Sequence, residues 1–329
     1  MRLPSIDILR VLVVAMIVHR HTFGSSDLLI SSVGVPFFFY LTGWLWRPGR
    51  RTVKEEVAHR WRTLGIPFVC WWLLLYPLFL AAFFFRGDLS FERAVSPILR
   101  GSYVGTAYTT FWFISALFAV GILMRFLDRF SGTILILVGV SLLAIGGLLG
   151  EHLVVVPLGW GVALPSLAFA IFGRLSYRWS QVPAGRAVSL TVLIPAALVT
   201  VFFERIDIKY GDFGTPLVSG ILVALIIWGV LVLLDSIFLK VPALSGLGAW
   251  LGPLTSVAIV VVLVHPVVLW ALRFLAPGGG ASEAWIFIVA LVVPWIGALL
   301  LKRTKLAPYL LGQPSNPGAR KLRSQVNSA

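Results

Sequence analysis

The sequence predicts an all-α, polytopic membrane protein, a bundle of about ten transmembrane helices. Three observations lead to this fold class. The chain is 59% hydrophobic and only 12% charged, with a mean hydropathy of +0.95, which is far more apolar than an ordinary soluble domain of its 329 residues. Its apolar residues gather in segments long enough to cross a bilayer. Most of its basic residues fall in the loops on one side of those segments.

The expected spans follow one another along almost the whole chain. A helix needs about 20 mostly apolar residues to cross the hydrocarbon core. By that measure the spans are 6–24, 28–46, 64–85, 109–127, 131–149, 157–173, 187–203, 216–234, 250–275 and 284–301.

The distribution of Lys and Arg sets the expected topology. With the N-terminus in the cytoplasm, most of the 27 basic residues fall in cytoplasmic segments, as the positive-inside rule requires. An even number of spans then places the C-terminus in the cytoplasm as well. The formal net charge of +14 is therefore mainly a topological signal and does not indicate a partner nucleic acid.

No further folded domain fits beside the bundle. We expect a single membrane domain over residues 1–312 and a polar, disordered cytoplasmic tail over 313–329. The longest connection on the outer side, 86–108, is expected to hold a short interfacial helix. The single cysteine, Cys70, excludes a disulfide framework and a cysteine-based metal site.

The first span carries the most informative residues, Asp7, Arg10 and His21. Ionisable groups in hydrocarbon are costly, so they indicate a functional site by default. Arg10 and His21 are eleven residues apart, which places them within about 20° of one helix face and roughly 16 Å apart along the axis. Asp7 lies about one turn from Arg10, where mutual neutralisation is the simpler explanation. We predict that Arg10 and His21 look into one shared cleft.

The next two spans carry weaker signals. The second ends in an aromatic run followed by Thr42 and Gly43, a small-residue step that lets another helix approach closely. Arg60 and Arg62 stand at the mouth of the third span. The positive-inside rule alone explains them, and binding of a phosphorylated ligand is the competing interpretation.

The fourth and ninth spans hold further polar and aromatic candidates. Trp112 and Ser115 open the fourth span within an aromatic stretch that could be an interface belt. His265 and Pro266 interrupt the ninth, where the proline frees a backbone carbonyl near residue 262 for a neighbouring polar group. His265 either joins two helices by a hydrogen bond or contributes to a pocket. The other histidines are expected outside the site, with His19 facing away and with His59 and His152 in solvent.

These motifs together resemble the acyltransferase-3 family of integral membrane acyltransferases. The matching features are Asp7-x-x-Arg10 with His21, the run Phe38 to Gly43, Arg60-x-Arg62, Trp112-Phe113 and His265-Pro266. The resemblance implies a bundle that takes an acyl group, commonly acetyl, from cytoplasmic acyl-CoA. It implies delivery to a hydroxyl of a cell-envelope glycan or lipid-linked precursor, with the Arg10 and His21 positions essential. Val11 stands where the family usually has Gly, and Thr42 where it often has Ser.

The predicted function is that of an acyl-CoA-dependent O-acyltransferase. His21 would act as the general base or become transiently acylated. Arg10 would bind the phosphates of CoA, and Asp7 would orient Arg10. Arg60 and Arg62 are the further predicted CoA ligands. The predicted substrate pocket consists of Phe38, Thr42, Trp112, Ser115 and His265. The alternative function is an exporter or flippase of a glycan or small solute, against which the sequence shows no paired carboxylates at mid-membrane and no repeated halves.

The expected partners follow from that function. They are acyl-CoA, a sugar or lipid-linked acceptor and the lipid bilayer, with no nucleic acid and no metal. We expect a multi-pass protein of a bacterial plasma membrane. The sequence leaves open whether the protein forms a homodimer.

Overall fold

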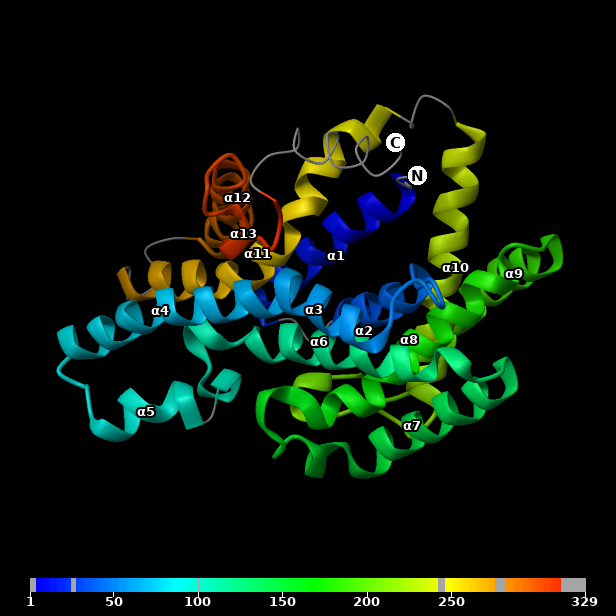
Figure 1. Cartoon of the computed structure of the whole chain (residues 1–329), viewed down its shortest axis with the longest axis horizontal. Coiled ribbons are helices and arrows are strands. Elements are labelled where there is room, and N and C mark those ends of the chain that lie inside the picture. Colours follow the sequence, from blue (N-terminus) through cyan, green and yellow to red (C-terminus); the bar gives the residue numbers. More distant parts are fainter. Residues whose placement is uncertain (1–3, 25–27, 100, 242–245, 276–281, 315–329) are drawn as a thin grey trace.

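The computed structural model describes the chain apart from residues 1–3, 25–27, 100, 242–245, 276–281 and 315–329, and the described part is built of helices (Figure 1). In chain order the α-helices are α1 (Pro4–Phe23), α2 (Leu28–Trp44), α3 (Val53–Arg60), α4 (Ile66–Phe85), α5 (Phe91–Leu99), α6 (Phe111–Phe126), α7 (Gly132–Leu153), α8 (Trp160–Trp179), α9 (Pro183–Thr200), α10 (Val218–Lys240), α11 (Leu247–Leu275), α12 (Glu283–Leu301) and α13 (Ala307–Leu310). The predicted all-α fold class is confirmed.

Within the described residues, eight helical segments are long and apolar enough to cross a membrane. They are Val53–Phe85, Phe111–Arg129, Gly132–Leu153, Pro157–Trp179, Pro183–Thr200, Val218–Lys240, Trp250–Phe274 and Glu283–Leu301. The first two predicted spans are helices as well, α1 and α2, but they fall outside this set. The charged side chains of α1 lower its hydropathy, and α2 has only 17 residues.

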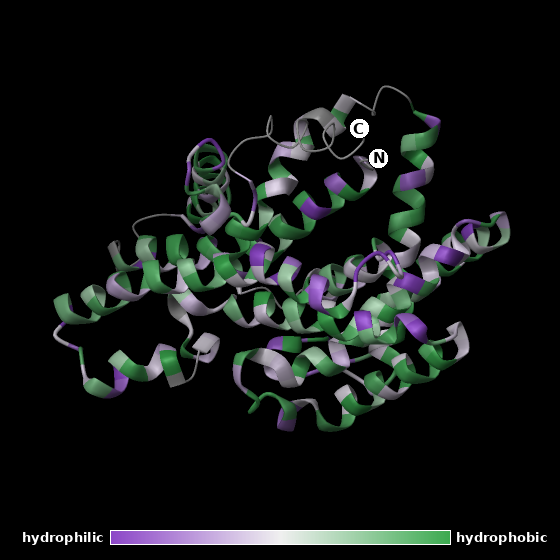
Figure 2. Cartoon of the chain, in the orientation of Figure 1, coloured by the Kyte–Doolittle hydropathy of each residue, from purple (hydrophilic) through white to green (hydrophobic). Residues whose placement is uncertain are grey.

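The outward faces of the long helices are apolar. Leu73 on α4, Leu137 on α7 and Ile194 on α9 are 58%, 63% and 67% exposed. Figure 2 shows hydrophobic residues along the whole of these helices, whereas hydrophilic residues collect at helix ends and in the connection between α2 and α3. Such exposed side chains would be unfavourable in water and match a surface covered by lipid.

Close packing of α2 against α8 fixes the centre of the bundle. A Cβ atom at Gly43 would collide with the carbonyl of Ala170, and one at Gly173 with the carbonyl of Tyr40. The two backbones therefore touch where each helix has a glycine. The predicted role of Gly43 as a close-contact residue is confirmed, and this contact sets the direction in which the aromatic side chains of α2 point.

The helix expected in the long connection before α6 is present as α5. It is a short amphipathic helix that Figure 1 shows beside α4, away from the rest of the bundle. Two short 3-10 turns, η2 (Gly101–Val104) and η3 (Thr106–Tyr108), lead from it into α6. The predicted disordered tail, 313–329, lies outside the described residues except for its first two positions.

Candidate functional site

A pair of histidines joins the first helix to the ninth predicted span. Nδ1 of His21 on α1 lies 2.9 Å from Nε2 of His265 on α11, and the two ring centroids are 4.9 Å apart. Nδ1 of His265 in turn lies 2.9 Å from the carbonyl oxygen of Val261. His265 is fully buried. His265 therefore joins two helices by a hydrogen bond, which was one of its two interpretations. Its partner is His21, the predicted catalytic residue.

The hydrogen bonds of the pair assign its protons. A carbonyl oxygen only accepts, so Nδ1 of His265 carries the hydrogen and its Nε2 is the acceptor when the ring is neutral. The hydrogen between the two rings then belongs to Nδ1 of His21. This tautomer leaves Nε2 of His21 with a lone pair and no proton, which is the form that a general base requires.

A proline positions the second histidine. Pro266 has no N–H to donate within α11, so the carbonyl of Val262 is free for another partner. Oγ1 of Thr110 donates to that carbonyl at 2.7 Å. The predicted free carbonyl near residue 262 is confirmed. The contact ties the start of α6 to the turn of α11 that carries His265.

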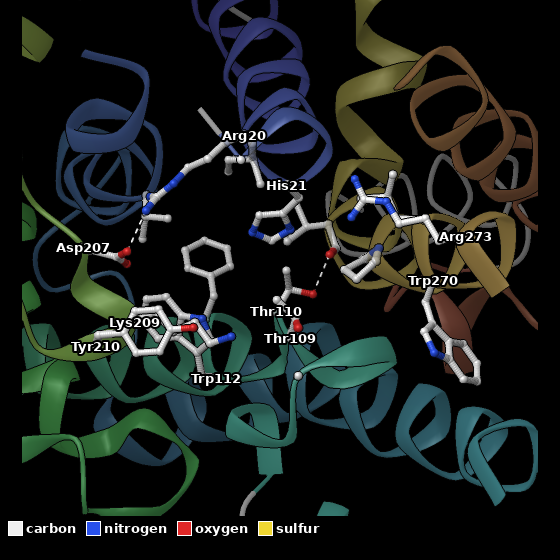
Figure 3. A pocket seen from close by; sticks show the side chains of 18 of the residues that line it. Arg20, His21, Thr109, Thr110, Trp112, Asp207, Lys209, Tyr210, Trp270 and Arg273 are labelled. Carbon is white, nitrogen blue, oxygen red and sulfur yellow. Dashed lines mark hydrogen bonds and ion pairs between the residues drawn. The ribbon is translucent and has the colours of Figure 1, made fainter. Parts of the chain in front are cut away.

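His21 opens onto a cleft of about 600 Å³, which we call the histidine pocket. Figure 3 shows its imidazole pointing into this cleft between Arg20 and Arg273, with Trp112 on the opposite wall. His265 does not line the cleft and lies behind His21. The predicted pocket residue Trp112 is thus in place, while His265 supports the site from outside the cavity.

Basic side chains dominate the charged lining of the histidine pocket. Arg20 pairs with Asp207 at 2.6 Å, whereas Arg205 and Lys209 have no carboxylate within ion-pair distance in the part of the chain that the structure describes. Burial lowers the pKa of Lys209 to about 8, and the neighbouring Asp207 only partly offsets that effect. The cleft around His21 therefore carries an excess of positive charge.

A second cavity of about 260 Å³, the arginine pocket, lies around Arg10. Phe38 and Thr42 of α2 form one wall. The arginines around the cavity are Arg10, Arg47, Arg50, Arg51, Arg60 and Arg125. These residues come from α1, α3, α6 and the connection between α2 and α3, so the fold concentrates the basic loop of the sequence onto Arg10.

Two carboxylates hold these arginines in place. Glu56, only 1% exposed, pairs with Arg60 at 2.8 Å, Arg125 at 3.1 Å and Arg51 at 3.2 Å. Asp128 pairs with Arg125 at 2.5 Å. It pairs also with Arg174 at 3.3 Å and accepts from Nε1 of Trp46 at 2.7 Å. Arg125 links both carboxylates and stacks over the Trp46 ring at 4.2 Å. Such buried charges are tolerated because each has a partner.

A glycine makes room for one of these side chains. A Cβ atom at Gly121 of α6 would collide with the guanidinium of Arg60. The guanidinium of Arg60 therefore lies against the α6 backbone at Gly121, and its Nε donates to Glu56 at 2.8 Å. The position of Arg60 is thus fixed by packing as well as by charge.

The two pockets meet at an aromatic contact. Phe38 lines the arginine pocket, Phe113 lines the histidine pocket, and their rings pack edge to face with centroids 5.5 Å apart. The prediction that Arg10 and His21 share a single cleft is wrong, because the two residues line separate cavities. The helical phase of α1 gives the direction of both side chains, but neighbouring helices insert aromatic rings between them.

Three predicted site residues lie elsewhere. Arg62 is exposed and lines neither pocket, because the helix turn that aims Arg60 inward aims Arg62 outward. Ser115 is buried and accepts from Nε1 of Trp160 at 2.8 Å, also away from both cavities. Asp7 is buried and accepts from Oγ1 of Thr255 at 3.0 Å. Asp7 lines neither pocket and contacts α11 instead.

The structure also adds residues that sequence reasoning missed. Glu56 is the centre of the arginine cluster, and its spacing of four residues from Arg60 on one helix was the available signal. Lys209 and Thr110 reach the histidine pocket only through tertiary contacts. His59, expected in solvent, is half-buried and lines the arginine pocket.

Comparison with known proteins identifies a family. A family model described as an acyltransferase domain matches residues 3–303, nearly the whole chain. No curated protein and no solved structure matches.

Proposed function

The chain belongs to the acyltransferase-3 family of membrane acyltransferases, and from this premise we propose that it transfers an acyl group, in the first instance acetyl, from acyl-CoA to a hydroxyl of a cell-envelope glycan, glycolipid or related acceptor. The observation that carries the proposal is the His21–His265 pair, which presents an unprotonated nitrogen to a cleft at one end of α1. At the other end of the same helix, arginines surround Arg10.

The arginine pocket suits the donor. CoA carries several phosphate groups, and guanidinium groups bind phosphate through paired hydrogen bonds. Glu56 and Asp128 hold Arg60 and Arg125 rigidly, while Arg47 and Arg50 have no carboxylate partner among the residues that the structure describes. The set therefore combines fixed and unneutralised positive charge. Arg10 and Arg60 are the donor-binding residues that we propose, with the donor entering from the cytoplasm.

The distance along α1 suits the arm of the donor. Eleven residues of helix separate Arg10 from His21 by roughly 16 Å, a length that an extended pantetheine arm spans. In the arrangement described here the rings of Phe38 and Phe113 stand between the two pockets. The proposal therefore requires these side chains to change rotamer when the thioester passes, a movement of side chains without a movement of helices.

The transfer step uses the free nitrogen of His21. Nε2 takes the proton of the acceptor hydroxyl while the hydroxyl oxygen attacks the thioester carbonyl, and the C–S bond breaks to release the CoA thiolate. The positive charge that develops on His21 is stabilised by its hydrogen bond to Nε2 of His265. An acyl-histidine route would use the same nitrogen as nucleophile. Both routes require the tautomer that the His265 contact imposes.

The test separates donor binding from transfer. Purified protein in detergent is heated with and without acetyl-CoA, and acetyl transfer from labelled acetyl-CoA is measured in membranes of the expressing cells. We expect His21→Ala to keep stabilisation by acetyl-CoA and to lose transfer by about 100-fold or more. We expect Arg60→Ala to lose the stabilisation. Transfer by His21→Ala at the wild-type rate, or stabilisation by a glycan but not by acetyl-CoA, would contradict the proposal.

A further inference from the structure

A third cavity adjoins the histidine pocket and is not used by the chemistry above. It measures about 630 Å³, and we call it the aromatic groove. Phe68 and Trp72 of α4 form one wall and Tyr108 and Phe111 another. The far side is closed by the connection between α7 and α8, including Leu158. Its walls are mainly apolar, so water gains little by filling it.

One side chain separates the groove from the catalytic cleft. Trp112 lines both cavities and is only 4% exposed. Its backbone N–H donates to Oγ of Ser102, and Gly159 packs against it so closely that a Cβ atom there would lie 3.1 Å from its carbonyl oxygen. Trp112 is therefore a fixed partition. A molecule with one part in each cavity would pass along this ring.

The rim of the groove faces lipid. Leu73, Ile98, Val155 and Leu158 are 58%, 61%, 81% and 50% exposed, and all four line the groove. An apolar rim of this kind would be unfavourable next to water and is normal next to hydrocarbon. A hydrocarbon chain can therefore enter the groove sideways from the bilayer without crossing water.

The charge of the neighbouring cleft selects the head of such a molecule. Arg205 and Lys209 have no carboxylate at ion-pair distance among the described residues, and Arg273 pairs only with the exposed Glu283 at 3.2 Å. An anionic headgroup would neutralise this excess while it held a hydroxyl near His21.

The donor fits the groove less well. Its phosphates are matched by the arginine pocket, which lies behind the Phe38–Phe113 contact and shares no lining residue with the groove. The groove instead shares Trp112 with the cleft that we assign to the acceptor.

We propose that the acceptor is an anionic lipid, with its hydrocarbon chain in the aromatic groove, its phosphate or other acidic headgroup among the cations of the histidine pocket, and Trp112 between the two. This inference rests on the proposed function and specifies its acceptor class. It assigns Trp112, Ile98 and Val155 to chain binding and Lys209 to headgroup binding.

The experiment measures lipid retention by native mass spectrometry. The wild-type protein is purified in detergent and titrated with a long-chain polyprenyl phosphate, with the polyprenol that lacks the phosphate, and with inorganic phosphate. Ile98→Trp and Val155→Trp enlarge a groove-lining side chain on α5 and on the connection between α7 and α8, respectively. Leu137→Trp, on the lipid face of α7 and outside the groove, is the matched control.

We expect the polyprenyl phosphate to bind more tightly than either other probe, and each groove-filling variant to weaken it about tenfold. Leu137→Trp should bind as the wild type does. Equal retention by all three variants, or equal binding of polyprenol and polyprenyl phosphate, would overturn the inference. A shift in the preferred acyl length of the donor in Ile98→Trp would overturn it too, because it would place the donor's chain in the groove.

Stabilisation by acetyl-CoA is measured on the same preparations. If the groove inference fails alone, the wild-type protein still responds to acetyl-CoA. If the proposed function fails, that response is missing whatever the lipid result.

Discussion

The arginine pocket and the histidine pocket lie at two levels of α1, around Arg10 and around His21, and they differ in how their charged groups are paired. At the Arg10 end, the buried Glu56 and the partly buried Asp128 pair with some of the arginines, so positive charge is abundant and only part of it is neutralised. At the His21 end, the central pair is bonded to a backbone carbonyl and needs no ion pair. The arrangement in the arginine pocket suits recognition of a polyanion, and the arrangement of the histidine pair suits a group that must gain and lose a proton.

This contrast predicts that substitutions in the two pockets change different properties of the protein. A change in the arginine pocket should act on stability and donor affinity, because it leaves charges without partners. A change in the histidine pair should act on turnover, because it alters a proton position in a structure that otherwise stays packed. The following variants test the contrast in order of expected effect.

Glu56→Gln should have the largest effect on stability. The amide keeps the shape of the side chain but removes the negative charge that Arg60 and Arg125 share in a buried setting. Breaking a buried ion pair costs roughly 3 kcal/mol or more, so the thermal unfolding midpoint in detergent should fall clearly, together with stabilisation by acetyl-CoA. Glu55→Gln is the matched control, since Glu55 is an exposed residue of the same helix that caps its first turn. Equal losses in the two variants would show that Glu56 does not organise the pocket.

His265→Gln should lower turnover while leaving donor binding intact. A glutamine oxygen can accept from Nδ1 of His21, but it cannot keep the geometry set by the Val261 carbonyl. One weakened hydrogen bond of about 1 kcal/mol corresponds to a loss in kcat of roughly fivefold. His265→Leu removes the acceptor altogether and should lose more. Release of CoA from acetyl-CoA gives kcat and KM, and a rise in KM without a fall in kcat would contradict this role.

The difference between the two pockets also explains which of their residues could be predicted from the sequence. The arginine pocket was largely predictable, since most of its cations lie within one loop and Arg10 follows from helical phase. The His21–His265 contact joins residues 244 positions apart, so only the family resemblance and the oddity of a histidine before a proline pointed to it. The Phe38–Phe113 contact was not predictable, because it depends on how α2 and α6 pack. The Ser115–Trp160 contact likewise depends on helix packing, whereas Arg62 points outward because of its place on the helix turn after Arg60.

Gly121→Ala should raise the KM for acetyl-CoA by several-fold, up to about tenfold. The added methyl group collides with the guanidinium of Arg60 and moves it away from its present position against α6. Because the histidine pair is untouched, kcat should change little. Gly297→Ala, at a site on α12 where an added methyl meets no other atom, is the matched control. A fall in kcat with unchanged KM would place the role of Arg60 in the transfer step.

The smallest expected effect is a pH dependence at the histidine end. Burial lowers the pKa of Lys209 to about 8, so its ammonium is charged below that pH and neutral above it, whereas a solvated lysine stays charged to a much higher pH. If Lys209 binds the acidic headgroup of the acceptor, affinity for a polyprenyl phosphate should fall by about three- to tenfold as the pH rises through 8, the value of one partly screened charge contact. Lys209→Arg keeps its charge and should bind evenly across this range, while Lys209→Met should bind weakly at every pH. The arginine pocket offers the internal comparison, since its guanidinium groups stay charged and stabilisation by acetyl-CoA should not change between pH 7 and 9. A fall of the same size in Lys209→Arg would assign the titration to another group and remove Lys209 from the headgroup site.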